Sequence, residues 1–193
     1  MTQIFQSLVL KPFLGLLFLV SPMTFSQTNF TAIERLDKFM KESCNTEYTE
    51  IASDSIAQTL KHKVYHISQE TRNIYGDKHT ESHKFIVIDN GESVNSFERI
   101  NGDMDLPELE SYIKEDFRLT EQTAPHFQGM LDLIYPIPSW KPDKREFFFK
   151  NGHWYFLRDA YFRTKQGFEV TVDENGKIIS ICYKMKWDEP ESK

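Results

Sequence analysis

The chain has 193 residues, and 23 lysines and arginines against 29 aspartates and glutamates give it a formal net charge of −6. This acidic balance argues against a nucleic-acid-binding protein, which needs a basic surface to displace counterions from phosphates. Sixteen phenylalanines, eight tyrosines and three tryptophans suffice to fill a hydrophobic core, which excludes a disordered chain.

Residues 1–26 have the layout of a secretory signal peptide. Lys11 is their only charged residue, residues 12–20 are almost wholly apolar, and Thr24-Phe25-Ser26 supplies small residues before a cut. The apolar run is about half of the ~20 residues that a bilayer-spanning helix needs. We therefore expect a cleaved leader, one domain over 27–193, a secreted or periplasmic location and no membrane span after cleavage. An uncleaved anchor is the alternative.

The first half of the remaining chain is predicted to mix helices and strands. Thr31 and Glu34 form a capping-box pair at the start of an amphipathic helix. Asn90-Gly91 accepts the positive φ angles of a tight hairpin turn. Asp105 with Glu108 predicts the N-terminal cap of a later helix. The expected elements are helices over 31–42 and 51–60, strands over 64–71, 83–88 and 93–100, and helices over 105–117 and 124–135.

The last fifty residues predict an antiparallel meander, in which strand-like segments are separated by short turns that contain glycine. The longest segments would span about 36 Å at ~3.3 Å per residue, and strands of that length usually bend or bulge. We therefore expect an α+β fold with N-terminal helices packed on a curved antiparallel sheet that ends in a C-terminal four-strand meander. The segments are 145–150, 153–163, 168–172 and 177–187.

The segments FFFKNGHWYFL and GFEVTVDENGKIISI, with the capped first helix, resemble the NTF2-like and cystatin-like α+β rolls at the level of fold. The resemblance covers the last quarter of the chain. It implies a roll in which helices lie against a curved sheet. Both fold groups include enzymes, binding proteins and structural modules, so the resemblance implies no particular function.

The two cysteines, Cys44 and Cys182, would meet an oxidising compartment if the chain is secreted, and a disulfide between them would close a long loop. In the last strand, however, Cys182 falls on the polar row with Lys184, whereas the apolar row runs through Tyr183 to Trp187. A helix that covered the apolar face would leave Cys182 on the opposite side. A disulfide and two unpaired thiols therefore both remain open.

Four histidines form two pairs at i, i+4 spacing, His62 with His66 and His79 with His83. Either pair shares a face on a helix or on a strand, and so provides two imidazoles for zinc or copper. Neither pair has the glutamate of the His-Glu-x-x-His arrangement, which disfavours a zinc protease. The interpretation we favour is a polar segment without a metal.

The strand predicted over 153–163 carries large side chains on both faces. An arginine in an otherwise apolar row must find a carboxylate or a bound anion. Arg158 therefore lies in a ligand pocket with Trp154 or Tyr161 near its mouth, or it pairs with an internal acid. The acids considered are Glu146 and Glu169. The two rows are Trp154, Phe156, Arg158, Ala160 and Phe162 on one face, and His153, Tyr155, Leu157, Asp159, Tyr161 and Arg163 on the other.

The leading functional hypothesis is a secreted or periplasmic, non-catalytic binding protein that uses the aromatic side chains of the meander and needs no cofactor. Its partner would be a protein, as for an inhibitor or immunity factor, or a small apolar ligand. A contiguous exposed aromatic patch would indicate a protein partner, and an enclosed pocket a small ligand. The alternative is a small hydrolase or isomerase with Arg158, Asp159, Tyr161 or His126 converging between helices and sheet. A structural envelope component is the third hypothesis.

Overall fold

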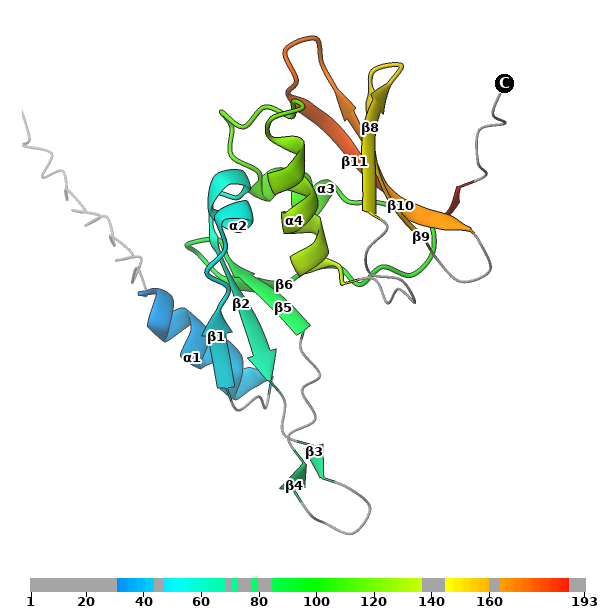
Figure 1. Ribbon diagram of the computed structural model, residues 1–193. Helices are drawn as coiled ribbons and strands as arrows, with labels where there is room; N and C mark the ends of the chain where they lie inside the picture. The colour runs from blue at the N-terminus through cyan, green and yellow to red at the C-terminus, as the bar shows by residue number, and fades with distance from the viewer. Residues whose placement is uncertain are drawn as a thin grey trace, which may run out of the picture.

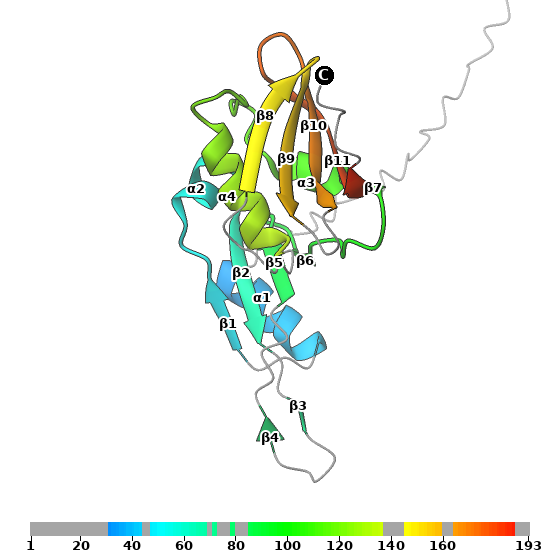
Figure 2. The same ribbon diagram turned by 45° about the vertical axis from the view of Figure 1, so that its right-hand side comes forward.

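The computed structural model describes residues 31–43, 47–68, 71–72, 78–79, 85–136, 145–159 and 164–187. The segment predicted to be a signal peptide lies outside this range. The fold is α+β with antiparallel sheets, as predicted, and Figures 1 and 2 show two main sheets with a helical layer between them. Within the described range, no helix combines the length and the hydropathy that crossing a bilayer requires.

The first sheet is built from the N-terminal half and has the strand order β1-β2-β5-β6. Its two central strands, β2 and β5, carry buried side chains on both faces. Tyr65 and Val87 on one face pack against helix α1, and Val64 and Ile88 on the other face belong to the main core. The elements are α1 (Ala32–Glu42), β1 (Glu47–Glu50), β2 (Lys63–Ser68), β5 (Phe85–Asp89) and β6 (Val94–Ser96), and β3 (Thr71–Arg72) pairs with β4 (Lys78–His79) in a separate ribbon.

The second sheet contains the predicted meander. Its strand order is β7-β11-β10-β9-β8, so the four C-terminal strands follow one another antiparallel and one short strand adds to the edge at β11. These strands are β7 (Met104–Asp105), β8 (Arg145–Lys150), β9 (His153–Asp159), β10 (Lys165–Val172) and β11 (Ile178–Trp187).

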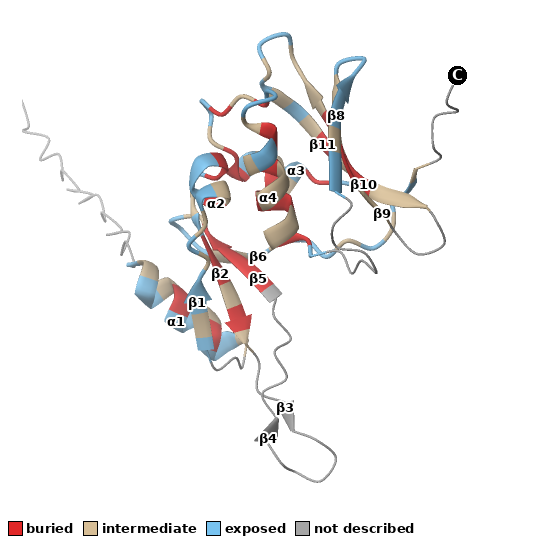
Figure 3. Cartoon of the chain, in the orientation of Figure 1, coloured by how far each residue is buried: buried red, intermediate tan, exposed pale blue. Residues whose placement is uncertain are grey.

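Three helices, α2 (Asp54–Thr59), α3 (Pro107–Tyr112) and α4 (Ala124–Ile134), fill the layer between the sheets. The α4 helix is apolar on several sides because it packs against elements on more than one face, and Figure 3 shows much of it as buried. The Phe127 ring lies 5.2 Å from the ring of Phe156 on β9. Ile88 of the first sheet and Ile181 of the second therefore belong to one continuous core.

One predicted helix start is wrong. Asp105 does not cap a helix but lies in β7, where it pairs with Cys182 of β11, and α3 begins at Pro107. The helix is also shorter than expected, since Ile113 is extended and forms an isolated bridge with Leu60. The pattern of apolar residues up to Phe117 is thus produced by a short helix and a buried irregular segment.

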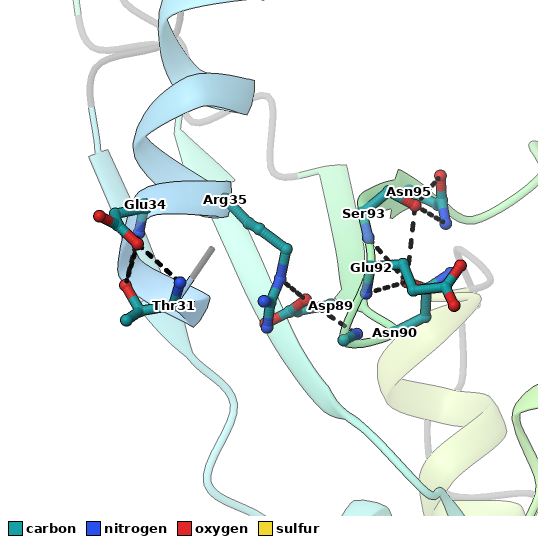
Figure 4. A network of polar contacts seen from close by, with 9 residues as sticks. Thr31, Glu34, Arg35, Asp89, Asn90, Glu92, Ser93 and Asn95 are labelled. Atoms are coloured by element: carbon teal, nitrogen blue, oxygen red, sulfur yellow. Dashed lines mark hydrogen bonds and ion pairs between the residues drawn. The ribbon is translucent and has the colours of Figure 1, made fainter. Parts of the chain in front are cut away.

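A polar network ties α1 to the end of β5 (Figure 4). The capping box between Thr31 and Glu34 is present, as predicted. In the next position, Arg35 Nε and Nη2 donate to the two carboxylate oxygens of Asp89 at 2.7 and 2.8 Å, and Asp89 also accepts from the Gly91 amide at 3.1 Å. Burial by itself raises the pKa of Asp89, but the hydrogen bonds from Arg35 and Gly91 outweigh it and hold that pKa below its ordinary value.

Candidate functional site

The five-stranded sheet has two chemically different faces. On β9, Trp154, Phe156 and Arg158 point toward the helical layer, which makes this the inner face. His153, Tyr155 and Leu157 alternate with them and lie on the opposite, outer face. The two rows predicted from the sequence therefore hold along the described part of β9.

Arg158 forms an ion pair with Asp132 of α4, and each of the two side chains is 10% exposed. The predicted partners, Glu146 and Glu169, are wrong. They stand opposite Leu157 and Tyr155 in the sheet, so their side chains lie on the outer face, where Arg158 cannot reach them.

Asp132 also contacts Arg145, which stands opposite Arg158 on the neighbouring strand β8. One carboxylate therefore lies between two guanidinium groups. Burial lowers the pKa of Arg158, while the adjacent Tyr183 acts in the opposite direction. The Tyr183 hydroxyl itself donates to Gln166 Oε1 at 3.1 Å. This cluster accounts for Arg158 as a link between helix and sheet.

Trp154, the second residue predicted to bind a ligand, is 5% exposed. Its ring lies 5.4 Å from the ring of Phe149 and 6.3 Å from the rings of Phe147 and Phe156. Trp154 is therefore part of the aromatic core of the inner face. Tyr161, the third predicted residue, lies outside the described residues.

On the outer face, three aromatic side chains from separate strands are in contact. The ring of Phe148 on β8 stacks on Tyr155 of β9, with centroids 5.1 Å apart. The ring of Trp187 on β11 meets Tyr155 edge to face at 5.3 Å. Phe148 is 36% exposed, and the other two are half-buried. The described helices that contact this sheet pack on its inner face, so none of them covers the aromatic row, and Leu157 on the same outer face is 5% exposed.

A β-bulge places Trp187 in this row. Lys165 pairs with Trp187 and Gly167 pairs with Lys184, so two residues of β11 stand opposite Gln166 alone. The extra residue reverses the alternation, and the prediction that Trp187 shares the apolar row of Tyr183 is wrong. Gly167 is needed at the bulge because a Cβ there would lie 2.0 Å from the carbonyl oxygen of Phe156.

Charged and polar side chains border the aromatic row. The Lys184 ammonium lies 4.5 Å from the ring centroid of Trp187 and donates to Glu169 Oε2 at 2.7 Å. Glu169 Oε1 is 3.3 Å from His153 Nδ1, which also lies 3.1 Å from the Thr171 hydroxyl. The hydrogen bond with Glu169 raises the pKa of Lys184. The outer face thus combines aromatic rings with fixed charges of both signs.

Cys182 lies on the outer face, as its place in the polar row predicts, and its Sγ is 3.6 Å from the Tyr183 carbonyl oxygen. Burial, followed by the hydrogen bond with Asp105, raises the pKa of this thiol. A nucleophilic cysteine requires the opposite shift, so this environment does not favour catalysis by Cys182. Cys44 lies outside the described residues, and the disulfide stays a prediction.

The candidate metal ligands are distributed over several places. The His62 ring meets Tyr112 edge to face at 6.3 Å, and His66 is opposite Ile86 in the first sheet. His79 belongs to β4, and His83 lies outside the described residues. In the described part of the chain, no group of three or more histidine, cysteine, aspartate or glutamate side chains is placed to hold a metal ion.

Two described residues of the enzyme hypothesis, Arg158 and Asp159, do not share a face of the sheet, and Tyr161 lies outside the described residues. Arg158 and Asp159 are consecutive in β9 and point to opposite faces, and His126 lies on α4.

Comparisons with protein-family models, with curated proteins and with solved structures found no match to this chain.

The outer-face residues Phe148, Tyr155 and Trp187 were not among the predicted binding residues. The alternation along β9 contained a signal for Tyr155, since it lies in the row opposite Arg158. For Trp187 the only signal was Gly167, which the predicted segment 168–172 left in a turn. In the structure β10 begins at Lys165, so Gly167 lies inside the strand, where a glycine marks a bulge.

Proposed function

We propose that this chain is a secreted or periplasmic, non-catalytic binding protein, and that its partner is another protein that docks on the outer face of the five-stranded sheet. The observation that carries this proposal is the contiguous row Phe148–Tyr155–Trp187, with ring centroids 5.1 and 5.3 Å apart. Aromatic side chains of this kind dominate the binding energy of protein interfaces because they bury a large area with few rotatable bonds.

The arrangement favours a protein over a small apolar ligand. An enclosed ligand is surrounded on most sides, whereas the aromatic row extends across the sheet from β8 to β11 on one face. Glu169 and Lys184 are held in place beside it by their mutual ion pair, with side chains 19% and 36% exposed. Charges at the margin of an aromatic patch orient a charged partner and exclude like-charged ones.

The location is supported by residues 1–26, whose short apolar run and small residues before Gln27 are typical of a secretory leader. Under this proposal the partner is met outside the cytoplasm. An inhibitor or an immunity protein belongs to this class of protein-binding proteins, because each acts by covering the surface of another protein.

The test compares three forms of the chain as bait for proteins of the extracellular or periplasmic fraction of its host. The forms are the wild type, the double variant Tyr155→Ala/Trp187→Ala, and the control Ile33→Ser, which changes an apolar side chain that is 64% exposed on α1. We expect one protein to bind the wild type and the control and to lose affinity at least about 100-fold for the double variant, as removal of two central aromatics predicts.

Titration calorimetry with the purified partner gives the affinities, and thermal unfolding confirms that each variant is folded. Equal affinity of wild type and double variant would exclude the outer face. Binding of an apolar dye or fatty acid in place of any protein, lost in the same variant, would favour the small ligand.

A further inference from the structure

Strand β8 forms one edge of the five-stranded sheet, and among the described strands only β9 pairs with it (Figures 1 and 2). Five of its six residues are exposed, and Figure 3 shows the strand as largely exposed. Phe149 has 54% of its surface exposed. An apolar edge strand with unpaired N–H and C=O groups is a template for pairing with another strand.

The β8–β9 hairpin determines which backbone groups of β8 point outward. Its two-residue turn Asn151-Gly152 has φ angles of 53° and 83°, as a type I′ turn requires. Lys150 and His153 flank this turn opposite each other and are therefore a hydrogen-bonded pair. Because hydrogen-bonded pairs alternate along the strand, Phe147 and Phe149 direct their N–H and C=O groups away from β9.

The segment Glu146–Lys150 is complementary to itself when two copies run antiparallel. With the two-fold axis at Phe148, Phe147 of each copy faces Phe149 of the other, and these are the residues whose backbone groups point outward. On the outer face, Glu146 of each copy then faces Lys150 of the other. A register with the axis at Phe147 would place each Glu146 opposite a phenylalanine and would lose both ion pairs.

We propose that two copies of this chain associate through β8 in the register centred on Phe148, which joins their five-stranded sheets into one continuous sheet. The pairing satisfies the outward backbone groups of Phe147 and Phe149 and covers the exposed Phe149 ring with Phe147 of the other copy. Glu146 already contacts Lys165 and is 46% exposed, so its carboxylate retains room for a second ammonium group. The interface does not depend on the function proposed for the outer face.

The experiment is sedimentation equilibrium of the full chain over a wide range of concentrations. We expect the wild type to show a monomer–dimer equilibrium. In E146K, a lysine faces a lysine at both ends of the paired segment, and in K150E a glutamate faces a glutamate at both ends. Each variant should raise the dissociation constant of the dimer at least about tenfold, or ~1.4 kcal/mol. The double variant E146K/K150E restores both pairs with their signs exchanged and should recover the dimer.

The control is Glu174→Lys, an exposed acid in the turn between β10 and β11, which should leave the dissociation constant unchanged. Phe149→Pro removes an outward N–H and should abolish the dimer, with circular dichroism to show that the variant is folded. A wild type that stays monomeric at the highest concentration, single reversals without effect, or a double variant that does not recover would each overturn the proposal. The charge exchange keeps the test decisive if the proline variant fails to fold.

Discussion

Asp132 of α4 pairs with Arg158 of β9 between the helical layer and the five-stranded sheet, and each side chain is only 10% exposed. The same carboxylate contacts Arg145 of β8. Both ion pairs and apolar packing therefore hold α4 on the sheet. The apolar contact is between Phe127, which lies more than one helical turn before Asp132 on α4, and Phe156 of β9.

Removing Asp132 alone should lower the free energy of unfolding more than replacing Asp132 and Arg158 together. Asp132→Ala removes the carboxylate that lies between two guanidinium groups, and we expect it to lower the free energy of unfolding by about 3 kcal/mol. The double variant Asp132→Leu/Arg158→Met replaces the pair by apolar side chains and should recover most of that loss. Urea denaturation measures both values.

The control for this series is Glu121→Ala, an exposed acid in the turn before α4, which should change the free energy of unfolding by less than about 0.5 kcal/mol. If Asp132→Ala behaved like this control, the ion pair would have no structural role.

Gly167→Ala should destabilise the sheet and disturb Trp187. A Cβ at this position would lie 2.0 Å from the Phe156 carbonyl oxygen, so β9 and β10 would have to separate. We expect a loss of more than about 1 kcal/mol in the free energy of unfolding. Gly152→Ala is the matched control, because its Cβ would meet nothing within 4 Å and only the positive φ of 83° opposes it. Equal losses in the two variants would show that the bulge does not require glycine.

The Asp89 carboxylate should make stability depend on pH in acid. Its pKa in the folded chain lies below the ordinary value of 3.8, so the ionised form stabilises the fold. This contribution is complete above the pKa of the unfolded chain and is lost as the pH falls through the lower pKa of the folded chain. Asp89→Asn should therefore be less stable than the wild type at pH 6, and the difference should shrink below about pH 4.

Urea midpoints between pH 6 and pH 2 give this comparison, with Asp37→Asn as the control at an exposed acid on α1. A constant difference between Asp89→Asn and the wild type over the whole range would contradict the assignment.

Local patterns predicted much of the fold. The capping box at Thr31 and the alternation in β9 rest on residues close in sequence, and both are present in the structure. The hairpin at Asn90-Gly91 also forms, but its loop covers residues 90–93 and only Gly91 has a positive φ, so the tight two-residue turn is wrong. Short strands escaped prediction because β1 and β7 are too brief to show a period. Asp105 illustrates the difficulty, since the same residue suits a helix cap and an edge strand beside Cys182.

The candidate site was harder to predict because it depends on pairing between distant strands. The partner of Arg158 is in a helix, and no sequence spacing relates it to Asp132. The predicted acids lie on neighbouring strands of the same sheet. Glu169 stands opposite Tyr155, so its side chain is on the outer face, whereas Arg158 is on the inner face. Trp187 reached the outer face through a single added residue in β11, and one bulge reverses every assignment beyond it.

The separate packing of α1 has a consequence for local opening of the fold. Leu36 and Met40 pack with Tyr65, Ile67 and Val87 in a cluster of their own, and no described α1 side chain belongs to the main core. Detachment of α1 therefore exposes one face of the first sheet without disturbing α4. We therefore expect the amides of α1 to exchange hydrogen with a lower opening free energy than those of α4, which should exchange only when the main core unfolds.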